Sequence, residues 1–243
     1  MINFKNKVAL VTGASSGIGA AIAKKLSNQG ARVFAAQRSS SDYEDILSDL
    51  SDPKAPEEII SVIKKVTGRL DILINNAGIM TEGNVEETTL KDWNQHLAIN
   101  LTAPFLLIRE AMPLLREFRG SIVNVGSVEG LGNNPRHPAY GASKSGLHGL
   151  TRAVAVDHGE DGVRCNAVAP GWIDTPLNEN FVKGMDDPIG FREKLSNIHP
   201  IGRSGQPSEV AALICWLVSD AASFVTGQVW TIDGGRMTKL SLP

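Results

Sequence analysis

Short apolar runs rich in β-branched residues recur along the chain, and most end at glycine, asparagine or proline. They occupy residues 7–13, 31–37, 70–78, 120–127, 163–171 and 227–235. Stretches with helical periodicity lie between them; Ile18, Ile22 and Leu26, for example, are spaced by four, and Gly30 ends the pattern. Alternating strands and helices with near-continuous apolar strands predict a doubly wound, Rossmann-like parallel sheet with helices on both faces.

The composition is that of a soluble globular chain, with 42% hydrophobic residues, 21% charged residues and a net charge of -2. Because no block of Lys and Arg occurs, we expect no nucleic-acid partner. The longest clear apolar run, residues 211–218, is far shorter than the roughly 18 residues of a membrane span. The first apolar run leads into a glycine-rich turn rather than a cleavage site, so we expect a cytoplasmic protein without a membrane partner.

No repeat, low-complexity segment or linker divides the 243 residues, so we predict one domain over 1–243. Two cysteines, Cys165 and Cys215, lie far apart in apolar surroundings. They predict buried free thiols rather than a disulfide framework, and no metal site is predicted.

The first predicted strand ends in a glycine-rich turn, TGASSGIG, at residues 12–19. In doubly wound sheets, ligands bind outside the carboxyl ends of the strands. Glycines 13, 17 and 19 allow the backbone to approach a pyrophosphate at the amino end of the following helix, residues 18–29. The spacing differs from G-x-G-x-x-G and a plain loop is the alternative, but a turn between a strand and a helix favours dinucleotide binding.

Tyr140 and Lys144 stand four apart, surrounded by small residues, in the segment HPAYGASKSGLHGL at 137–150. Residues four apart are neighbours on a helix, so the phenol and the amine share one small volume, although an ordinary surface pair is the alternative. A tyrosine with a pKa of about 10 is a poor base at neutral pH, whereas a nearby ammonium favours phenolate.

The later strand ends carry NNAG at 75–78, Ser127, Pro170 with Gly171, and DGG at 233–235. Together with TGASSGIG, Asn100 and YGASK, these motifs resemble the short-chain dehydrogenase/reductase (SDR) family over essentially the whole chain. Their order and spacing, with Ser127 thirteen residues before Tyr140, make the combination highly specific.

The resemblance implies a single-domain NAD(P)-dependent oxidoreductase that transfers hydride between the cofactor and a secondary alcohol or ketone, or a sugar-like polyol. It assigns proton transfer to Tyr140, and to Lys144 the tuning of that tyrosine and binding of the nicotinamide ribose. Ser127 would hold the substrate oxygen, and Asn100 a water beside Lys144. A backbone-bonded side chain that kinks a helix is the structural alternative for Asn100. A cofactor-sensing protein without turnover is the alternative function.

We expect the cofactor to contact the turn after the first strand, the end of the second strand and the later strand ends. The expected contacts are Gly13, Ser15, Ser16, Gly17, Ile18, Gly19, Gln37, Arg38, Asp49, Leu50, Asn76, Ala77, Gly78, Tyr140, Lys144, Pro170, Gly171, Ile173 and Thr175.

Cofactor choice depends on the end of the second strand, where an acidic residue would favour NAD. Gln37 occupies that position and cannot repel a 2′-phosphate, and Arg38 can pair with one. The sequence therefore favours NADP. NAD is the alternative, because glutamine also bonds ribose hydroxyls, Arg38 can stack on adenine, and Ser15 and Ser16 replace the basic residue of many NADP-dependent members.

Two features depart from the family pattern. The interval between Arg38 and Asp49 is short, which predicts that the helix after the second strand is truncated or absent. Gly126 precedes the serine where a second serine is frequent.

The segment 176–200 matches the substrate lid of the family, with Phe181, Met185 and Phe191 giving a partly apolar cover. His137 is either a substrate contact or a solvated loop histidine. Other residues expected near the substrate pocket are Glu129, Asn134 and Trp172.

The resemblance also implies a homo-oligomer, a dimer or a homotetramer, formed through the helix of Tyr140 and the helix before it. The C-terminal tail, 236–243, is predicted to pack on the body or on a neighbouring subunit through Met237, Leu240 and Leu242. Small residues of the tyrosine helix are predicted to serve packing: Gly141, Ala142, Ser145, Gly146 and Gly149.

Overall fold

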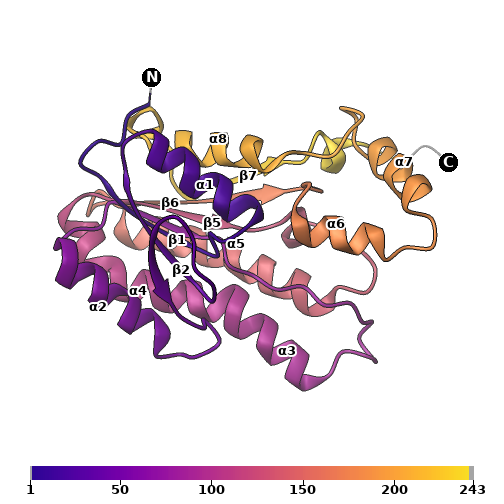
Figure 1. Cartoon of the computed structure of the whole chain (residues 1–243), viewed down its shortest axis with the longest axis horizontal. Helices are drawn as coiled ribbons and strands as arrows, with labels where there is room; N and C mark the ends of the chain where they lie inside the picture. The colour runs from indigo at the N-terminus through magenta and orange to yellow at the C-terminus, as the bar shows by residue number, and fades with distance from the viewer. Residues whose placement is uncertain (1, 241–243) are drawn as a thin grey trace.

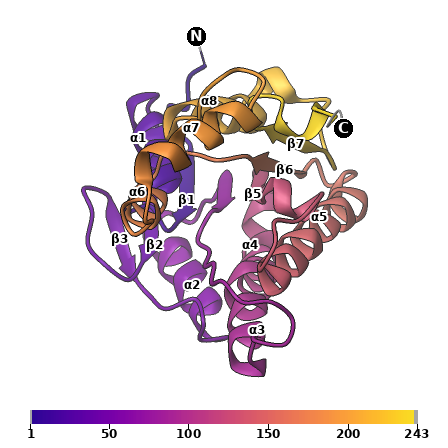
Figure 2. The same ribbon diagram turned by 90° about the vertical axis from the view of Figure 1, so that its right-hand side faces the viewer.

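The computed structural model describes residues 2–240, whose strands form one seven-stranded parallel sheet in the order β3-β2-β1-β4-β5-β6-β7 (Figures 1 and 2). The strands are β1 (Val8–Thr12), β2 (Arg32–Gln37), β3 (Glu44–Leu47), β4 (Ile72–Asn75), β5 (Ser121–Val125), β6 (Arg164–Pro170) and β7 (Val229–Ile232). The order reverses between β1 and β4, which leaves a crevice at their carboxyl ends.

Helices cover both faces of the sheet. They are α1 (Gly17–Asn28), α2 (Ala55–Thr67), α3 (Leu90–Leu97), α4 (Ala103–Glu117), α5 (Pro138–His158), α6 (Pro176–Lys183), α7 (Pro188–Ile198) and α8 (Pro207–Val218). Figure 2 shows α1 and α8 on one face and α2, α4 and α5 on the other. The predicted doubly wound α/β fold is confirmed.

The sheet is apolar on both sides because successive residues of a strand point to opposite faces. Ala9 and Val11 pack toward α1 and α8 with Ile22, whereas Leu10 packs on the other side with Ile59. All five residues of β1 are buried. This two-sided burial explains why the strands read as continuous rather than alternating apolar runs.

The edge strand β3 was not predicted from the sequence. Its residues, EDIL, include two acids, and all are exposed or half-buried, so no apolar run marks it. Main-chain pairing with β2, from Phe34↔Glu44 to Gln37↔Leu47, holds it in the sheet. Among the described residues no helix lies between β2 and β3, which confirms the predicted loss of that helix.

One helical stretch, Leu90–Glu117, is long and apolar enough by length and composition to cross a membrane. It consists of α3, a π-helical turn at Ala98–Thr102, and α4. Half of its most apolar window is buried inside the fold. Buried core helices share this length and composition with membrane spans.

The described part of the C-terminal tail returns to the segment between β5 and α5. Arg236 Nη2 donates to Asn134 Oδ1 at 2.6 Å, and the Met237 methyl lies beside Gly132. Leu240 is 89% exposed, and Leu242 lies outside the described residues. The predicted packing is confirmed on the body for the start of the tail, whereas Leu240 does not pack on the body of its own subunit; its packing on a neighbouring subunit stays a prediction.

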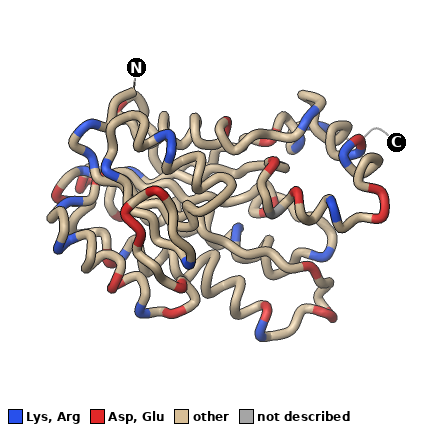
Figure 3. Tube along the Cα trace, viewed as in Figure 1, with Lys and Arg blue, Asp and Glu red and all other residues tan. Residues whose placement is uncertain are grey.

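Charged residues of both signs are interspersed along the chain, and neither sign is confined to one end of the molecule in the view of Figure 3. The net charge of -2 therefore does not conceal one strongly acidic and one strongly basic half. The charge distribution in this view therefore does not point to a field of one sign that would steer charged ligands over long range.

Asp71 joins the starting ends of three strands. Its side chain is 2% exposed and accepts hydrogen bonds from the Val8 amide at 2.9 Å, Lys7 Nζ at 3.1 Å and Arg69 Nε at 2.7 Å. Its main-chain carbonyl accepts from Ser121 N at 2.8 Å. Burial pushes the pKa of Asp71 upward, but the hydrogen bonds from Arg69, Val8 and Lys7 together hold it below its usual value.

We expect Asp71→Asn to lower the free energy of unfolding at pH 7 by about 2 to 3 kcal/mol, because a buried amide cannot balance two cations. A native pKa below the unfolded value of about 3.9 stabilises the protein above that pH, and the contribution is lost as the pH falls below it. Urea denaturation at pH 7 and pH 3 checks both the size and the trend. Asp161→Asn is the control, since its ion pair with Arg116 is partly exposed, and should change stability by less than about 0.5 kcal/mol.

Candidate active site

A cavity of about 770 Å³ lies at the carboxyl ends of the central strands. Every residue predicted to contact the cofactor lines it, and so does Ser127. Asn100 does not line it but lies directly behind Gly78, which does. Lining residues that the sequence reasoning missed are Ala36, Ser48, Ser51, Ile79, Met80, Gln95, Ile99, Val125, Gly126 and Asn178.

The glycine-rich turn is locked to the end of β4. Thr12 Oγ1 accepts from the amides of Asn76 at 2.9 Å and Ala77 at 3.0 Å, and Asn76 Nδ2 donates to the carbonyls of Thr12 at 2.9 Å and Gly13 at 3.1 Å. Gly13 has φ of 66°, which favours glycine, and a Cβ at Gly19 would overlap the Gly13 carbonyl. The two motifs therefore form one rigid wall of the cavity.

Asn100 lies in the π-helical turn Ala98–Thr102 between α3 and α4. Its Oδ1 accepts from Ile79 N at 2.9 Å, and its Nδ2 donates to Ile79 O at 3.0 Å and Ser143 Oγ at 3.0 Å. This bonding to a neighbouring backbone, at a helix irregularity, confirms the structural alternative for Asn100. The carbonyl oxygen Oδ1 keeps one unused lone pair, so the side chain can also accept from a water.

Lys144 lies against the end of β5, where its Nζ donates to Val125 O at 2.8 Å. The same Nζ lies 5.6 Å from the centre of the Tyr140 ring. A Cβ at Gly78 would be 3.4 Å from Lys144 Nζ and 3.2 Å from Asn100 Oδ1, so this glycine leaves the ammonium and the amide facing one small space. The structure therefore brings Asn100, Tyr140 and Lys144 together.

Burial disfavours charge on both members of the helix pair. It raises the pKa of Tyr140 to about 12, with the Glu129 charge adding to the rise and the Ser127 hydroxyl opposing it. Burial lowers the pKa of Lys144 to about 8. In the protein without a bound cofactor, burial therefore dominates the pKa of Tyr140, and the lowering expected from Lys144 does not prevail.

Ser127 begins a short helical turn, Val128–Gly130, directly after β5. It is 7% exposed, and its Oγ accepts a hydrogen bond from the main-chain amide of Glu129 at 3.1 Å. Accepting this bond leaves the hydroxyl proton available, and the hydroxyl also interacts with Tyr140, whose pKa it lowers.

The end of β2 carries Gln37, which is buried, lines the cavity and donates through Nε2 to Asp45 Oδ1 at 2.8 Å. Gln37 Oε1 is buried without a hydrogen-bond partner. Arg38 also lines the cavity, as does Asp49. The pKa of Asp49 is lowered mainly by hydrogen bonds from Ser51 and to a smaller extent by the charge of Arg38. Asp45 was missed from the sequence because it lies on the unpredicted strand β3.

Three aromatic side chains from the segments after β6 form a cluster. Trp172, after β6, has its ring centre 5.9 Å from Phe181 of α6 and 5.7 Å from Phe191 of α7. Figure 1 shows α6 and α7 together beyond the carboxyl ends of the strands. The predicted partly apolar character of the segment 176–200 is confirmed.

His137 is only 8% exposed, so its interpretation as a solvated loop histidine is wrong. Burial follows from the position of its ring beside Glu129, with Nδ1 2.9 Å from Oε2. Neither His137 nor Glu129 lines the cavity.

Cys165 and Cys215 are free and buried, as predicted, and burial raises the pKa of both thiols, that of Cys215 to about 12. Over residues 2–240, no group of three or more His, Cys, Asp or Glu side chains is arranged to hold a metal ion.

The sequence matches the family model described as "Enoyl-(Acyl carrier protein) reductase" over residues 13–237. It is 36% identical to the uncharacterized oxidoreductase YxbG of Bacillus subtilis (strain 168), over 98% of this chain and 93% of that protein. It is 35% identical to meso-2,3-butanediol dehydrogenase of Serratia marcescens, over 96% of each. The solved aldohexose dehydrogenase of Thermoplasma acidophilum is 33% identical with a TM-score of 0.93, over 99% of this chain and 98% of that one.

The chain belongs to the short-chain dehydrogenase/reductase family. The resemblance deduced from its motifs is thereby confirmed, and the protein is an NAD(P)-dependent oxidoreductase that acts on CH–OH groups.

The departure of this SDR at Gly126 has a steric cause. A Cβ at Gly126 would overlap Nε2 of His148, which lies one helical turn after Lys144 on α5 and is 2% exposed. Burial lowers the pKa of His148 to about 4, so the imidazole is neutral near pH 7. The histidine occupies the space that a serine side chain at position 126 would need.

Two of the small residues on α5 have the packing role predicted for them. A Cβ at Gly141 would overlap Asn133 Oδ1, and one at Gly146 would lie 2.7 Å from a Leu101 methyl. Gly149, in contrast, has open space beside it in the described chain.

We expect Gly126→Ala to lower the free energy of unfolding by about 1 to 3 kcal/mol through overpacking against His148. Gly126→Ala combined with His148→Ala should cost clearly less than the sum of the two single changes. Gly149→Ala is the matched control, and replacing a helical glycine in open space should stabilise by up to about 1 kcal/mol. Chemical denaturation measures all four variants; additive effects of the first pair would contradict the steric explanation.

Proposed function

We propose that this SDR transfers hydride between a nicotinamide cofactor and a secondary alcohol or ketone, or a sugar-like polyol, with Tyr140, Lys144, Ser127 and Asn100 as the proton-handling set. The observation that carries the proposal is the convergence of Tyr140, Lys144 and Ser127 on the cavity that the glycine-rich turn also lines. A dinucleotide site and a proton-transfer group thereby share one space.

The residues present fit a dinucleotide. Gly13 and Gly19 allow a tight turn, since a Cβ at Gly19 would overlap the Gly13 carbonyl, and Ser16 begins α1 without a side-chain cap, so the first main-chain amides of α1, at residues that line the cavity, are left without a side-chain partner. The orphaned Gln37 Oε1 is an acceptor for a ribose hydroxyl. When bound, the nicotinamide supplies or accepts the hydride.

In the oxidation direction, Tyr140 must first lose its own proton to solvent, and its phenolate Oη then takes the proton of the substrate hydroxyl; in reduction the neutral phenol gives its proton to the substrate oxygen and is reprotonated from solvent. Ser127 donates its free hydroxyl proton to that oxygen and stabilises the charge that develops on it. Lys144 stays protonated near pH 7, since its pKa is about 8, and holds positive charge near the phenol. Asn100 keeps an acceptor for a water through which Lys144 exchanges protons with solvent.

The substrate is a small alcohol or carbonyl compound. The named relatives include a butanediol dehydrogenase, a cyclohexanol dehydrogenase of Acinetobacter sp. (strain SE19) and an aldohexose dehydrogenase, all named for neutral alcohols or sugars. The segment 176–200, with α6 and α7, acts as the lid of the substrate pocket, and its aromatic cluster with Trp172 gives that pocket an apolar wall.

The protein assembles as a homo-oligomer, a dimer or tetramer, through the outer sides of α4 and α5. Phe105 on α4 is 46% exposed and Val156 on α5 is 81% exposed. Exposed apolar side chains on two adjacent helices are consistent with a covered face.

The cofactor is preferentially NADP. Arg38 lines the cavity next to Gln37, and its guanidinium can pair with a 2′-phosphate in bidentate fashion. Asp45 does not line the cavity, because its carboxylate is bonded to Gln37 and Ser41.

Tyr140→Phe should abolish measurable turnover, a loss of at least ~10²-fold, while the Kd of the cofactor stays nearly unchanged, because only the transferable proton is removed. Ser127→Ala should lower kcat by ~10²- to 10³-fold. Lys144→Ala should weaken both activity and cofactor binding. The assay follows nicotinamide absorbance over a panel of alcohols and ketones, with cofactor titrated by fluorescence.

Tyr43→Phe is the control for the tyrosine, because Tyr43 is the chain's other tyrosine and lies outside the cavity. Its activity should match the native enzyme. Substantial activity in Tyr140→Phe would refute the proton role, and native cofactor binding without turnover on any substrate would instead favour a cofactor sensor.

For the cofactor, native kcat/KM should be higher with NADP than with NAD. Gln37→Asp should shift the preference toward NAD through charge repulsion of the 2′-phosphate, and Arg38→Ala should lower kcat/KM for NADP by about 10-fold or more. Steady-state kinetics with both cofactors measures this. A native preference for NAD contradicts the proposal, and an unshifted Gln37→Asp shows that position 37 is not the selector.

A further inference from the structure

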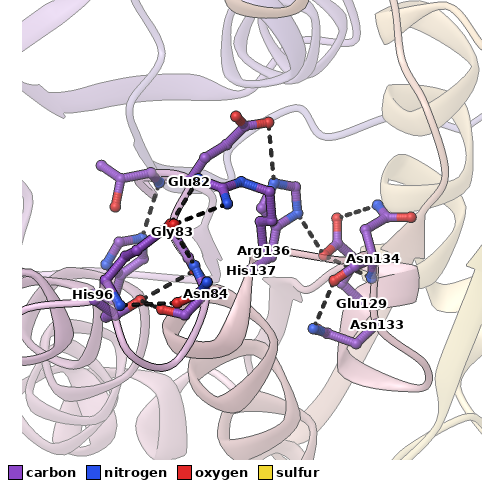
Figure 4. Close-up of polar contacts among 12 residues, drawn as sticks. Glu82, Gly83, Asn84, His96, Glu129, Asn133, Asn134, Arg136 and His137 are labelled. Carbon is purple, nitrogen blue, oxygen red and sulfur yellow. Dashed lines mark hydrogen bonds and ion pairs between the residues drawn. The ribbon is translucent and has the colours of Figure 1, made fainter.

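A buried polar cluster lies beside the cavity without lining it (Figure 4). At its centre, Glu129 is 8% exposed and accepts hydrogen bonds from Asn134 Nδ2 at 2.7 Å and Asn134 N at 3.3 Å. His137 Nδ1 lies 2.9 Å from Glu129 Oε2, and because a carboxylate only accepts, Nδ1 carries the proton. The cluster therefore ties the segment after β5 to the start of α5.

Glu129 contacts Ser127 directly and Tyr140 indirectly, through His137. Its main-chain amide donates to Ser127 Oγ at 3.1 Å. Its carboxylate binds His137, which immediately precedes α5 and whose ring lies edge-on to that of Tyr140, with centres 6.3 Å apart. Besides the direct interaction of the Ser127 hydroxyl with Tyr140, a second connection between the two residues therefore runs through Glu129 and His137.

We propose that Glu129 is a positioning residue that sets the separation of Ser127 and Tyr140, through its amide on the serine and through His137 on the start of the tyrosine helix. The inference rests on the proposed function, because the separation of the two hydroxyls matters only if both take part in the proposed reaction. Glu129 touches no reacting atom itself and acts only through its neighbours.

The charge of Glu129 also reaches Tyr140. It adds to burial in raising the pKa of the phenol. The hydrogen bond from His137 helps hold the pKa of Glu129 below its usual value against burial, and the same bond raises the pKa of His137. The neutral imidazole of His137 donates its Nδ1 proton to the carboxylate but carries no charge, so in that state the negative charge of Glu129 acts on the phenol without a compensating imidazolium.

The charged and titratable groups on the segments packed around His137 are Glu82 and Glu87 after β4, Glu129 after β5, Arg136, Tyr140 and Lys144 at the start of α5, and Arg236 near the C-terminus. Glu82 Oε1 lies 3.8 Å from His137 Nε2, too far for a hydrogen bond. Arg136 pairs with Glu87 at 2.7 Å in an exposed position. Glu129 is accordingly the group that fixes His137.

The test compares Glu129→Ala and Glu129→Gln with native enzyme. Glu129→Ala keeps the main-chain amide on Ser127 but loses the carboxylate that binds His137, so it should lower kcat by about 10- to 100-fold through misplacement of Tyr140, with the cofactor Kd within about twofold of native. Glu129→Gln retains an acceptor for His137 and should keep more than ~10% of kcat. Because it removes the negative charge near Tyr140, the inflection of the pH profile of kcat/KM for alcohol oxidation should move down by about 0.5 to 1 in pH.

Glu87→Gln is the matched control: it removes a carboxylate nearby, in the loop bonded to Arg136, and should change neither kcat nor the inflection. Thermal melting shows whether each variant folds. If Glu129→Ala does not fold, the comparison of Glu129→Gln with native enzyme decides the test. Native kcat with an unmoved inflection in Glu129→Gln, or equal shifts in Glu87→Gln, would overturn the inference. If Tyr140→Phe and Ser127→Ala also keep full activity, the proposed function itself fails.

Discussion

The site depends on one constraint of the parallel sheet, the reversal of strand order between β1 and β4. Strands on either side of this point send their following segments to opposite faces, so their carboxyl ends stay uncovered and side by side. The Thr12–Asn76 hydrogen bonds join the two sides across the gap and fix the glycine-rich turn. Ser127, Pro170 and Gly171 reach the same space because β5 and β6 end at the same edge of the sheet.

Within that space, the main energetic problem is the burial of ionisable groups. A buried phenol with a pKa of about 12 and a buried amine with a pKa of about 8 favour neutral tyrosine beside ammonium near pH 7. This state is suited to donating a proton in reduction. In oxidation the phenol must lose its proton, and an additional positive charge beside it lowers the pKa. Proton removal is thereby coupled to the presence of oxidised cofactor.

The groups proposed for catalysis are held by contacts from other elements. Lys144 is held by the Val125 carbonyl, Ser127 by the Glu129 amide and Asn100 by the backbone of Ile79. Contacts of this kind reduce the reorganisation needed when charge develops during the reaction. Asn100 makes its contacts with the segment after β4 from an irregular π-helical turn.

The sequence was sufficient for whatever depends on local spacing or on a contiguous motif. The glycine-rich turn, the Tyr140–Lys144 helix pair and the apolar strands are of this kind, since backbone geometry alone relates their residues. The edge strand β3 was not predictable, because main-chain pairing rather than apolar burial holds it, and with it Asp45 was missed. Contacts such as Gly126 with His148 join residues far apart in sequence and leave no periodic trace.

The same distinction separates the general chemistry from substrate choice. The dinucleotide and proton-transfer groups lie on strand ends and on α5, whose positions are fixed by a core buried on both sides of the sheet. The proposed lid, α6 and α7, lies instead beyond the carboxyl ends of the strands and carries little of the core (Figure 1). Substitutions there change the pocket at small cost in stability, whereas the Glu129 link keeps Ser127 and Tyr140 in register whichever substrate is bound. Reaction class and substrate specificity can therefore vary independently on this fold.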